Sequence, residues 1–94
     1  MIRLNAFFTV KDDASIAEVL KLGAELVGYS RKDEGNKGYD LFQSATNPRI
    51  MMFCETWATQ ELLDKHSAAP HFTRLVPQIE ALTTEGLHIN SFEF

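Results

Sequence analysis

Four stretches of this sequence alternate apolar and other residues with a period of two, and the segments between them repeat apolar residues at helical spacing. Alternation predicts strands over residues 2–10, 38–44, 49–57 and 87–94. Apolar residues at helical spacing predict helices over residues 14–30, 60–68 and 71–83, with Pro70 ending the second helix or starting the third. The resulting βαββαβ order is that of a ferredoxin-like α+β sandwich.

The faces of the predicted strands indicate how this sheet is covered. Residues 2–10 have one wholly apolar face, and a mixed face that carries Asn5 and Phe7. Residues 49–57 are largely apolar on both faces, which indicates a strand covered on both sides. Helices of a ferredoxin-like sandwich cover one sheet face only. We therefore expect the other face to pack against the sheet of a second copy, in a two-fold dimer.

Length and composition exclude several classes of protein. The 94 residues predict a single domain, 1–94. The net charge is −4 and the nine Lys and Arg residues are scattered, so we expect neither nucleic acid nor an anionic membrane as a partner. No stretch resembles a signal peptide or a membrane span. Cys54 is the only cysteine, which excludes an internal disulfide and makes the cytoplasm the expected location.

No cofactor fingerprint is present in the sequence. The run GNKG at residues 35–38 lacks the Lys-Ser/Thr pair of a phosphate-binding loop and leads into a strand rather than a helix. Cys54 has no cysteine partner for a zinc site. A metal held by His66 and His71 would need Glu55 or His88 as a third ligand, in a spacing that matches no known signature. We therefore predict neither a metal nor a cofactor.

The chemistry available to the chain is concentrated in a few polar and aromatic side chains. His66 lies on the apolar side of its predicted helix, where a titratable ring beside an apolar pocket is a natural proton acceptor or donor. His71 follows across the helix break. Trp57, at the end of a strand, could wall a ring-shaped ligand. Asn5 and Tyr39 could each contact a polar ligand. Hydrogen bonding or packing within the core remains the alternative for all five.

Several of these residues together resemble a family signature. Glu55, Trp57, Leu63, His66, Pro70, His71 and Phe72 match the pattern E-x-W…L-x-x-H-x-x-x-P-H-F of the antibiotic biosynthesis monooxygenase family. Upstream, Ser30-Arg31…Glu34-Gly35…Tyr39-Asp40-Leu41-Phe42 resembles the S-R-x-E-x-G…Y-x-L-F segment of that family. The resemblance covers nearly the whole chain.

The resemblance implies a dimeric α+β barrel with a pocket between the sheet and the helices of each subunit. Namesake members of the family oxidise phenolic or quinol-type aromatics with O₂, without flavin, metal or haem. Carried over to this chain, His66 or Asn5 would handle the substrate proton or hydroxyl. The substrate-binding residues would be Trp57, Tyr39, His71, Phe72 and Phe7.

Departures from the family pattern leave alternatives open. The haem-degrading branch has an axial histidine where this chain has Val76, which disfavours haem degradation. An isomerase branch that processes a phosphorylated signal compound shares the His-x-x-x-Pro-His spacing. Isomerisation of a small hydroxy-carbonyl compound is therefore the first alternative to oxygenation. The second alternative is a dimer that binds a small molecule without catalysis.

Overall fold

Four strands form one antiparallel sheet in the order β2-β3-β1-β4. The structure is a computed structural model that describes residues 1–94. Its elements are β1 (Ile2–Thr9), a 3₁₀ turn (Asp13–Ser15), α1 (Ile16–Ser30), β2 (Asn36–Gln43), β3 (Ile50–Trp57), α2 (Gln60–Ser67), α3 (Pro70–Glu80) and β4 (His88–Glu93). The ferredoxin-like α+β fold predicted from the sequence is confirmed, and the predicted elements differ from the observed ones only by a few residues at their ends.

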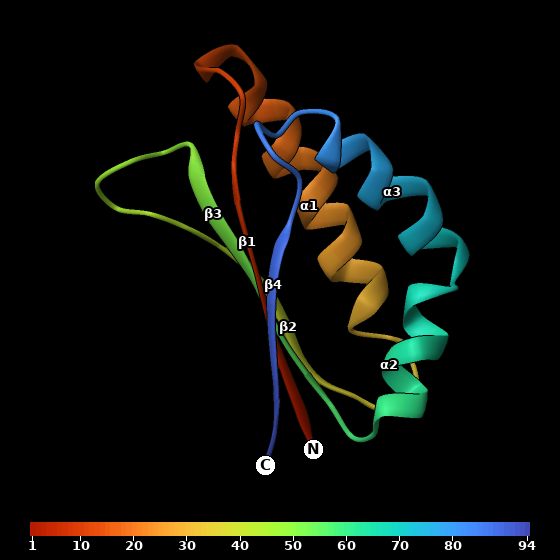
Figure 1. Cartoon of the computed structure of the whole chain (residues 1–94). Coiled ribbons are helices and arrows are strands. Elements are labelled where there is room, and N and C mark those ends of the chain that lie inside the picture. Colours follow the sequence, from red (N-terminus) through yellow and green to blue (C-terminus); the bar gives the residue numbers. More distant parts are fainter.

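All three helices lie on one side of the sheet, as Figure 1 shows. The core fills the space between these two layers. It consists of apolar side chains from the helices and from the inner face of the sheet, where Ala6 of β1 pairs with Phe53 of β3, and Phe8 with Met51. Gly23 lets α1 approach the sheet closely, because a Cβ at this position would lie 2.4 Å from Leu41 Cδ2.

The break between α2 and α3 follows from local sequence. Thr59 begins α2 by accepting a hydrogen bond from the backbone N–H of Leu62 at 3.2 Å. Pro70 is the first residue of α3, a position where its missing N–H costs nothing. The chain therefore turns sharply after Ser67, and His66 and His71 come to lie next to each other, with ring centroids 5.7 Å apart.

The outer face of the sheet carries exposed aromatic and aliphatic side chains. Phe7, Phe42, Ile50 and Phe92 belong to this face and all are exposed, because no helix covers them. Asn5 lies on the same face, paired with Cys54. The second copy predicted to cover this face stays a prediction. None of the helices has the length and apolar character needed to cross a membrane.

Candidate functional site

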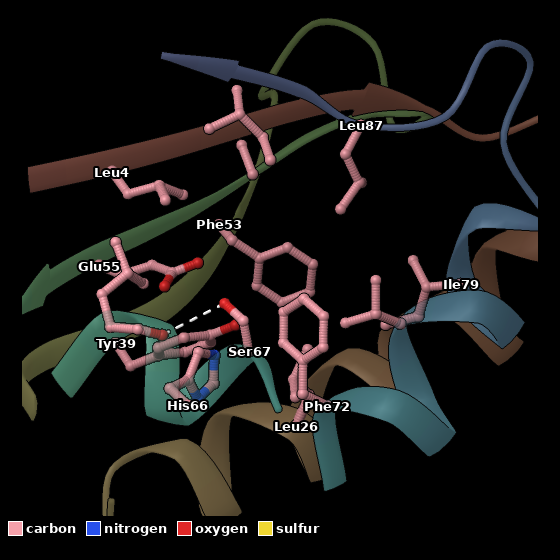
Figure 2. Close-up of a pocket in the computed structure, with 14 residues that line it drawn as sticks. Leu4, Leu26, Tyr39, Phe53, Glu55, His66, Ser67, Phe72, Ile79 and Leu87 are labelled. Carbon is pink, nitrogen blue, oxygen red and sulfur yellow. Dashed lines mark hydrogen bonds between the residues drawn. The ribbon is translucent and has the colours of Figure 1, made fainter. Parts of the chain in front are cut away.

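A cavity of about 70 Å³ lies between the inner face of the sheet and the helices. Eleven of its fourteen lining residues are hydrophobic, a number that includes Tyr39 for its ring, so a molecule inside it would be largely shielded from water. Figure 2 shows the polar groups gathered at one end, where Tyr39, Glu55, His66 and Ser67 lie. Side chains such as Phe53, Ile79 and Leu87 form the apolar end.

His66 is a buried histidine with one anchored nitrogen and one unpartnered nitrogen. Its Nδ1 lies 2.7 Å from Asp33 Oδ2, while its buried Nε2 has no hydrogen-bond partner. A carboxylate only accepts hydrogen bonds, so the neutral ring carries its proton on Nδ1 and leaves a lone pair on Nε2. Burial lowers the pKa of His66, and Asp33 partly offsets this effect. His66 is therefore an oriented neutral base.

Aromatic rings fix the position of the His66 imidazole. The indole of Trp57 lies 4.5 Å away between ring centroids, and the rings of Phe72 and Tyr39 contact it edge-on at 5.3 and 5.5 Å. These neighbours come from β3, α3 and β2. The ring cannot turn without displacing packed aromatic side chains, so the free Nε2 is held in one place.

Glu55 places a second titratable group on the same cavity. Its Oε1 accepts a hydrogen bond from Trp57 Nε1 at 2.9 Å, and the side chain is buried. Burial raises the pKa of Glu55 to about 7, although the hydrogen bonds from Trp57 and Tyr39 lower it in part. Near neutral pH both protonation states of this carboxyl are populated. Burial, followed by the nearby Glu55 charge, raises the pKa of Tyr39, which therefore remains a phenol.

Asp33 connects His66 to a third side chain outside the cavity. It lies in the turn between α1 and β2, and its Oδ2 also lies 2.7 Å from Nε2 of His71. His71 stacks on Tyr29 and is not among the residues that line the cavity. The family resemblance predicts His71 against the substrate, whereas in the structure it lies behind His66, toward solvent.

The Asp33, His66 and His71 cluster has the geometry of a hydrogen-bonded network. The nitrogen and oxygen atoms all lie within 4.8 Å of one another, and they include the donor types of a metal site. Ligands about 2.1 Å from a common ion would lie roughly 3.0–3.4 Å apart. Here both nitrogens approach a single oxygen to 2.7 Å, as charge-assisted hydrogen bonds do.

The structure brings some of the residues predicted for the site together and separates others. His66, Tyr39 and Phe72 line the cavity, and Trp57 lies directly behind His66. Asn5 and Phe7 lie on the outer face of the sheet, because the neighbouring residues Leu4 and Ala6 of β1 face the cavity. Within one chain, Asn5 and Phe7 cannot reach a molecule in the cavity.

Sequence reasoning missed two members of the site, and each left a signal. Counted from Ser30, the acidic position of the S-R-x-E-x-G pattern falls on Asp33, not on Glu34. Glu55 lies between Phe53 and Trp57 on one face of the predicted strand 49–57. A carboxylate on an otherwise apolar face is an expensive group to bury, and a functional reason could have been sought for it.

Comparison with known proteins places this chain in a family. The family model for antibiotic biosynthesis monooxygenase matches residues 1–78. "Putative monooxygenase YcnE" of Bacillus subtilis is 30% identical over 89 residues, which is 95% of this chain and 93% of that protein.

Solved structures agree with that match. A crystal structure of an antibiotic biosynthesis monooxygenase is 33% identical with a TM-score of 0.93, and the match covers 100% of this chain and 98% of that one. A Bacteroides thetaiotaomicron protein of unknown function is 35% identical with a TM-score of 0.92, and the match covers 99% of this chain and 96% of that one. The chain described here belongs to the antibiotic biosynthesis monooxygenase family.

Proposed function

We propose that this protein is a cofactor-independent monooxygenase that oxidises a small phenolic or quinol-type aromatic compound with O₂. The observation that carries the proposal is the free Nε2 of His66, held by the Asp33 hydrogen bond at the wall of an apolar cavity. A general base needs this arrangement, with a fixed lone pair facing the substrate and a second group that orients the ring.

In the proposed reaction the residues of the cavity prepare the substrate for attack by O₂. His66 Nε2 takes the proton of a substrate hydroxyl, and Asp33 stabilises the imidazolium that forms. The deprotonated ring is electron-rich and supplies the electrons for O₂ reduction. Glu55 is placed to exchange a second proton. The apolar walls exclude water from the reactive intermediates.

We infer from the size of the cavity that the site opens when an aromatic substrate binds. A cavity of ~150 Å³ accepts benzene, whereas this one measures about 70 Å³. An aromatic ring therefore needs side chains at the rim to move. Leu87 and Ile89 are suited to this, because they lie beside or on β4, the edge strand of the sheet, and are themselves partly or largely exposed.

Oxygen consumption tests the proposal directly. We would incubate the protein with a panel of quinols and phenols and follow O₂ uptake for wild type, His66→Gln and His88→Gln. His88 is a matched control, because it is a histidine on β4 that lies outside the cavity. We expect His66→Gln to lose about 100-fold or more of the rate and His88→Gln to retain it. Equal O₂ uptake by wild type and His66→Gln would overturn the proposal.

Isomerisation is a second candidate, favoured by the two proton-transfer groups on one cavity. Glu55 and His66 could remove and return protons on neighbouring carbon or oxygen atoms of a hydroxy-carbonyl compound. A phosphorylated substrate fits less well, because no Lys or Arg lines the cavity. Arg31, Arg49 and Arg74 each pair with a carboxylate elsewhere. Turnover that persists without O₂ would identify this activity.

Binding without catalysis is the remaining candidate. It predicts a ligand that co-purifies with the protein and that binds equally well to His66→Gln, with no turnover of any tested compound. Mass spectrometry of the purified protein separates the candidates by the ligand it finds. An aromatic compound favours oxygenation, whereas a phosphorylated chain favours isomerisation. We further propose that the protein works as a homodimer in the cytoplasm, as the sequence predicts.

A further inference from the structure

One oxygen atom of Asp33 bridges two histidines in different environments. Asp33 Oδ2 lies 2.7 Å from Nδ1 of His66 and 2.7 Å from Nε2 of His71. The side chain of His66 is 1% exposed and borders the cavity, whereas that of His71 is 15% exposed. Nδ1 of His71 makes no hydrogen bond within the chain and is not among the buried atoms. The cluster thus reaches from the cavity to solvent.

The charges of this cluster limit how many protons it can hold. One carboxylate balances one imidazolium. A second imidazolium would place two positive charges with ring centroids 5.7 Å apart, one of them buried. Hydration favours the charge on His71, because water reaches that ring. Protonation of one histidine therefore opposes protonation of the other.

We propose that His71 is a positioning residue, and that His66 and His71 together carry one positive charge beside the Asp33 carboxylate. In this way His71 keeps His66 in its basic form until a ligand delivers a proton. When the substrate O–H bond breaks, a new N–H bond forms at Nε2 of His66. The Nδ1–H bond of His71 then breaks and its proton goes to solvent water. Both N–H groups that face Asp33 stay in place throughout, and the total charge of the cluster is unchanged.

The other charged and titratable groups around the cluster do not replace His71 in this role. They are Glu25 and Tyr29 of α1, Lys32 and Glu34 of the turn, Tyr39 of β2, Glu55 of β3, Lys65 of α2 and Arg74 of α3. Lys65 pairs with Glu34 and Arg74 with Glu25, so these charges largely cancel, and Lys32 is exposed to solvent. Burial is the main cause of the lowered pKa of His66. The Asp33 carboxylate raises this pKa, and the charge of His71 makes a smaller contribution that lowers it, which is the direction that the proposal requires.

Titration of His66 by NMR tests the proposal. The role of His71 rests on the proposed role of His66 as a base, but this measurement needs neither a substrate nor O₂. We would follow the His66 ring nitrogens in ¹⁵N-histidine-labelled wild type, His71→Gln, Asp33→Asn and Lys65→Gln, all with EDTA. Gln at position 71 retains an N–H donor for Asp33 without a charge. Lys65→Gln is the matched control, because it removes a positive charge from the residue before His66.

The proposal predicts opposite shifts for the two central variants. We expect His71→Gln to raise the pKa of His66 by about one unit, Asp33→Asn to lower it, and Lys65→Gln to change it by less than about 0.3 units. If Asp33→Asn does not fold, His71→Gln decides the question alone.

An unchanged or lowered His66 pKa in His71→Gln would overturn the proposal. So would a wild-type titration that changes when EDTA is left out, since a bound metal would displace the shared protons. Absence of O₂ uptake by wild type would contradict the proposed function without affecting this result.

Discussion

At the scale of single residues, Glu55 shows how a buried carboxyl ties stability to chemistry. It borders the cavity, and Trp57 supplies one fixed hydrogen bond to it. Burial raises the pKa of Glu55 from its ordinary value of 4.5 to about 7. The group is therefore near half-protonation at the pH of a cell, which suits a residue that gives and takes protons. The same shift means that its ionisation opposes folding.

Glu55 should make the protein less stable as the pH rises. A raised pKa in the folded state means that the native protein binds more protons than the unfolded chain between about pH 4.5 and 7. Protonated Glu55 therefore contributes roughly 3 kcal/mol to the free energy of unfolding below about pH 4.5. This contribution is lost as the pH rises through about 7. His66 acts in the opposite sense, because a lowered pKa costs stability as the pH falls. Its effect is expected to be similar in wild type and Glu55→Gln.

Urea unfolding at pH 5 and pH 8 would measure this effect. Glutamine keeps an oxygen that can accept the Trp57 hydrogen bond and cannot ionise. We expect the free energy of unfolding of Glu55→Gln relative to wild type to increase between pH 5 and pH 8 by about 2–3 kcal/mol. A constant difference across this range would show that Glu55 stays ionised in the folded protein.

At the scale of elements, the turn between α1 and β2 positions Asp33 through a glycine. Gly35 has a φ of +83°, and a Cβ there would lie 2.3 Å from Cδ1 and 2.8 Å from Cβ of Leu62 in α2. The carbonyl of Gly35 also accepts a hydrogen bond from the backbone N–H of Ala58 at 2.8 Å. The turn is therefore locked against β3 and α2, and Asp33, two residues earlier, is held beside His66.

Alanine substitutions at two glycines should have opposite effects. We expect Gly35→Ala to lower the free energy of unfolding by about 2–3 kcal/mol, because the new Cβ meets backbone strain and the Cβ of Leu62. Gly28→Ala in α1 is the control. No atom lies within 4 Å of its Cβ position, and we expect a gain of about 0.5–1 kcal/mol. Chemical denaturation measures both, and equal effects in the two variants would contradict the role given to the turn.

The sequence allowed the elements to be predicted more fully than the site. Period-two and helical patterns depend on local geometry, so the strands and the helices could be predicted without the structure. The wholly apolar face of residues 2–10 packs against the helices, and this places Asn5 and Phe7 on the other face. Assigning them to the cavity conflicted with that pattern. The contact of Asp33 with His66 joins residues 33 positions apart, which no local periodicity can reveal.

At the scale of the whole molecule, the uncovered sheet face is the feature that the monomer leaves unexplained. The exposed aromatic side chains of Phe7, Phe42 and Phe92 all lie on this face, whereas the helices pack on the other face of the sheet. Clusters of this kind on a small domain mark contact surfaces. The same face holds the buried Oδ1 of Asn5, which lacks a donor within the chain. A facing sheet could supply that donor and bury the aromatic rings.

We therefore expect the protein to be a two-fold dimer that packs sheet against sheet. A charge at the centre of this face should separate the two subunits. Sedimentation at micromolar concentration should give twice the 10.6 kDa chain mass for wild type and 10.6 kDa for Phe7→Glu. Leu20→Glu on α1 is the matched control, because its side chain is 38% exposed against 40% for Phe7 but lies on the helical side. It should remain dimeric. If wild type sediments as a monomer, the predicted dimer does not form. If only Leu20→Glu disrupts the dimer, the contact surface lies on the helical side instead. In the expected case Asn5 and Phe7 act in assembly, which explains why they face away from the cavity.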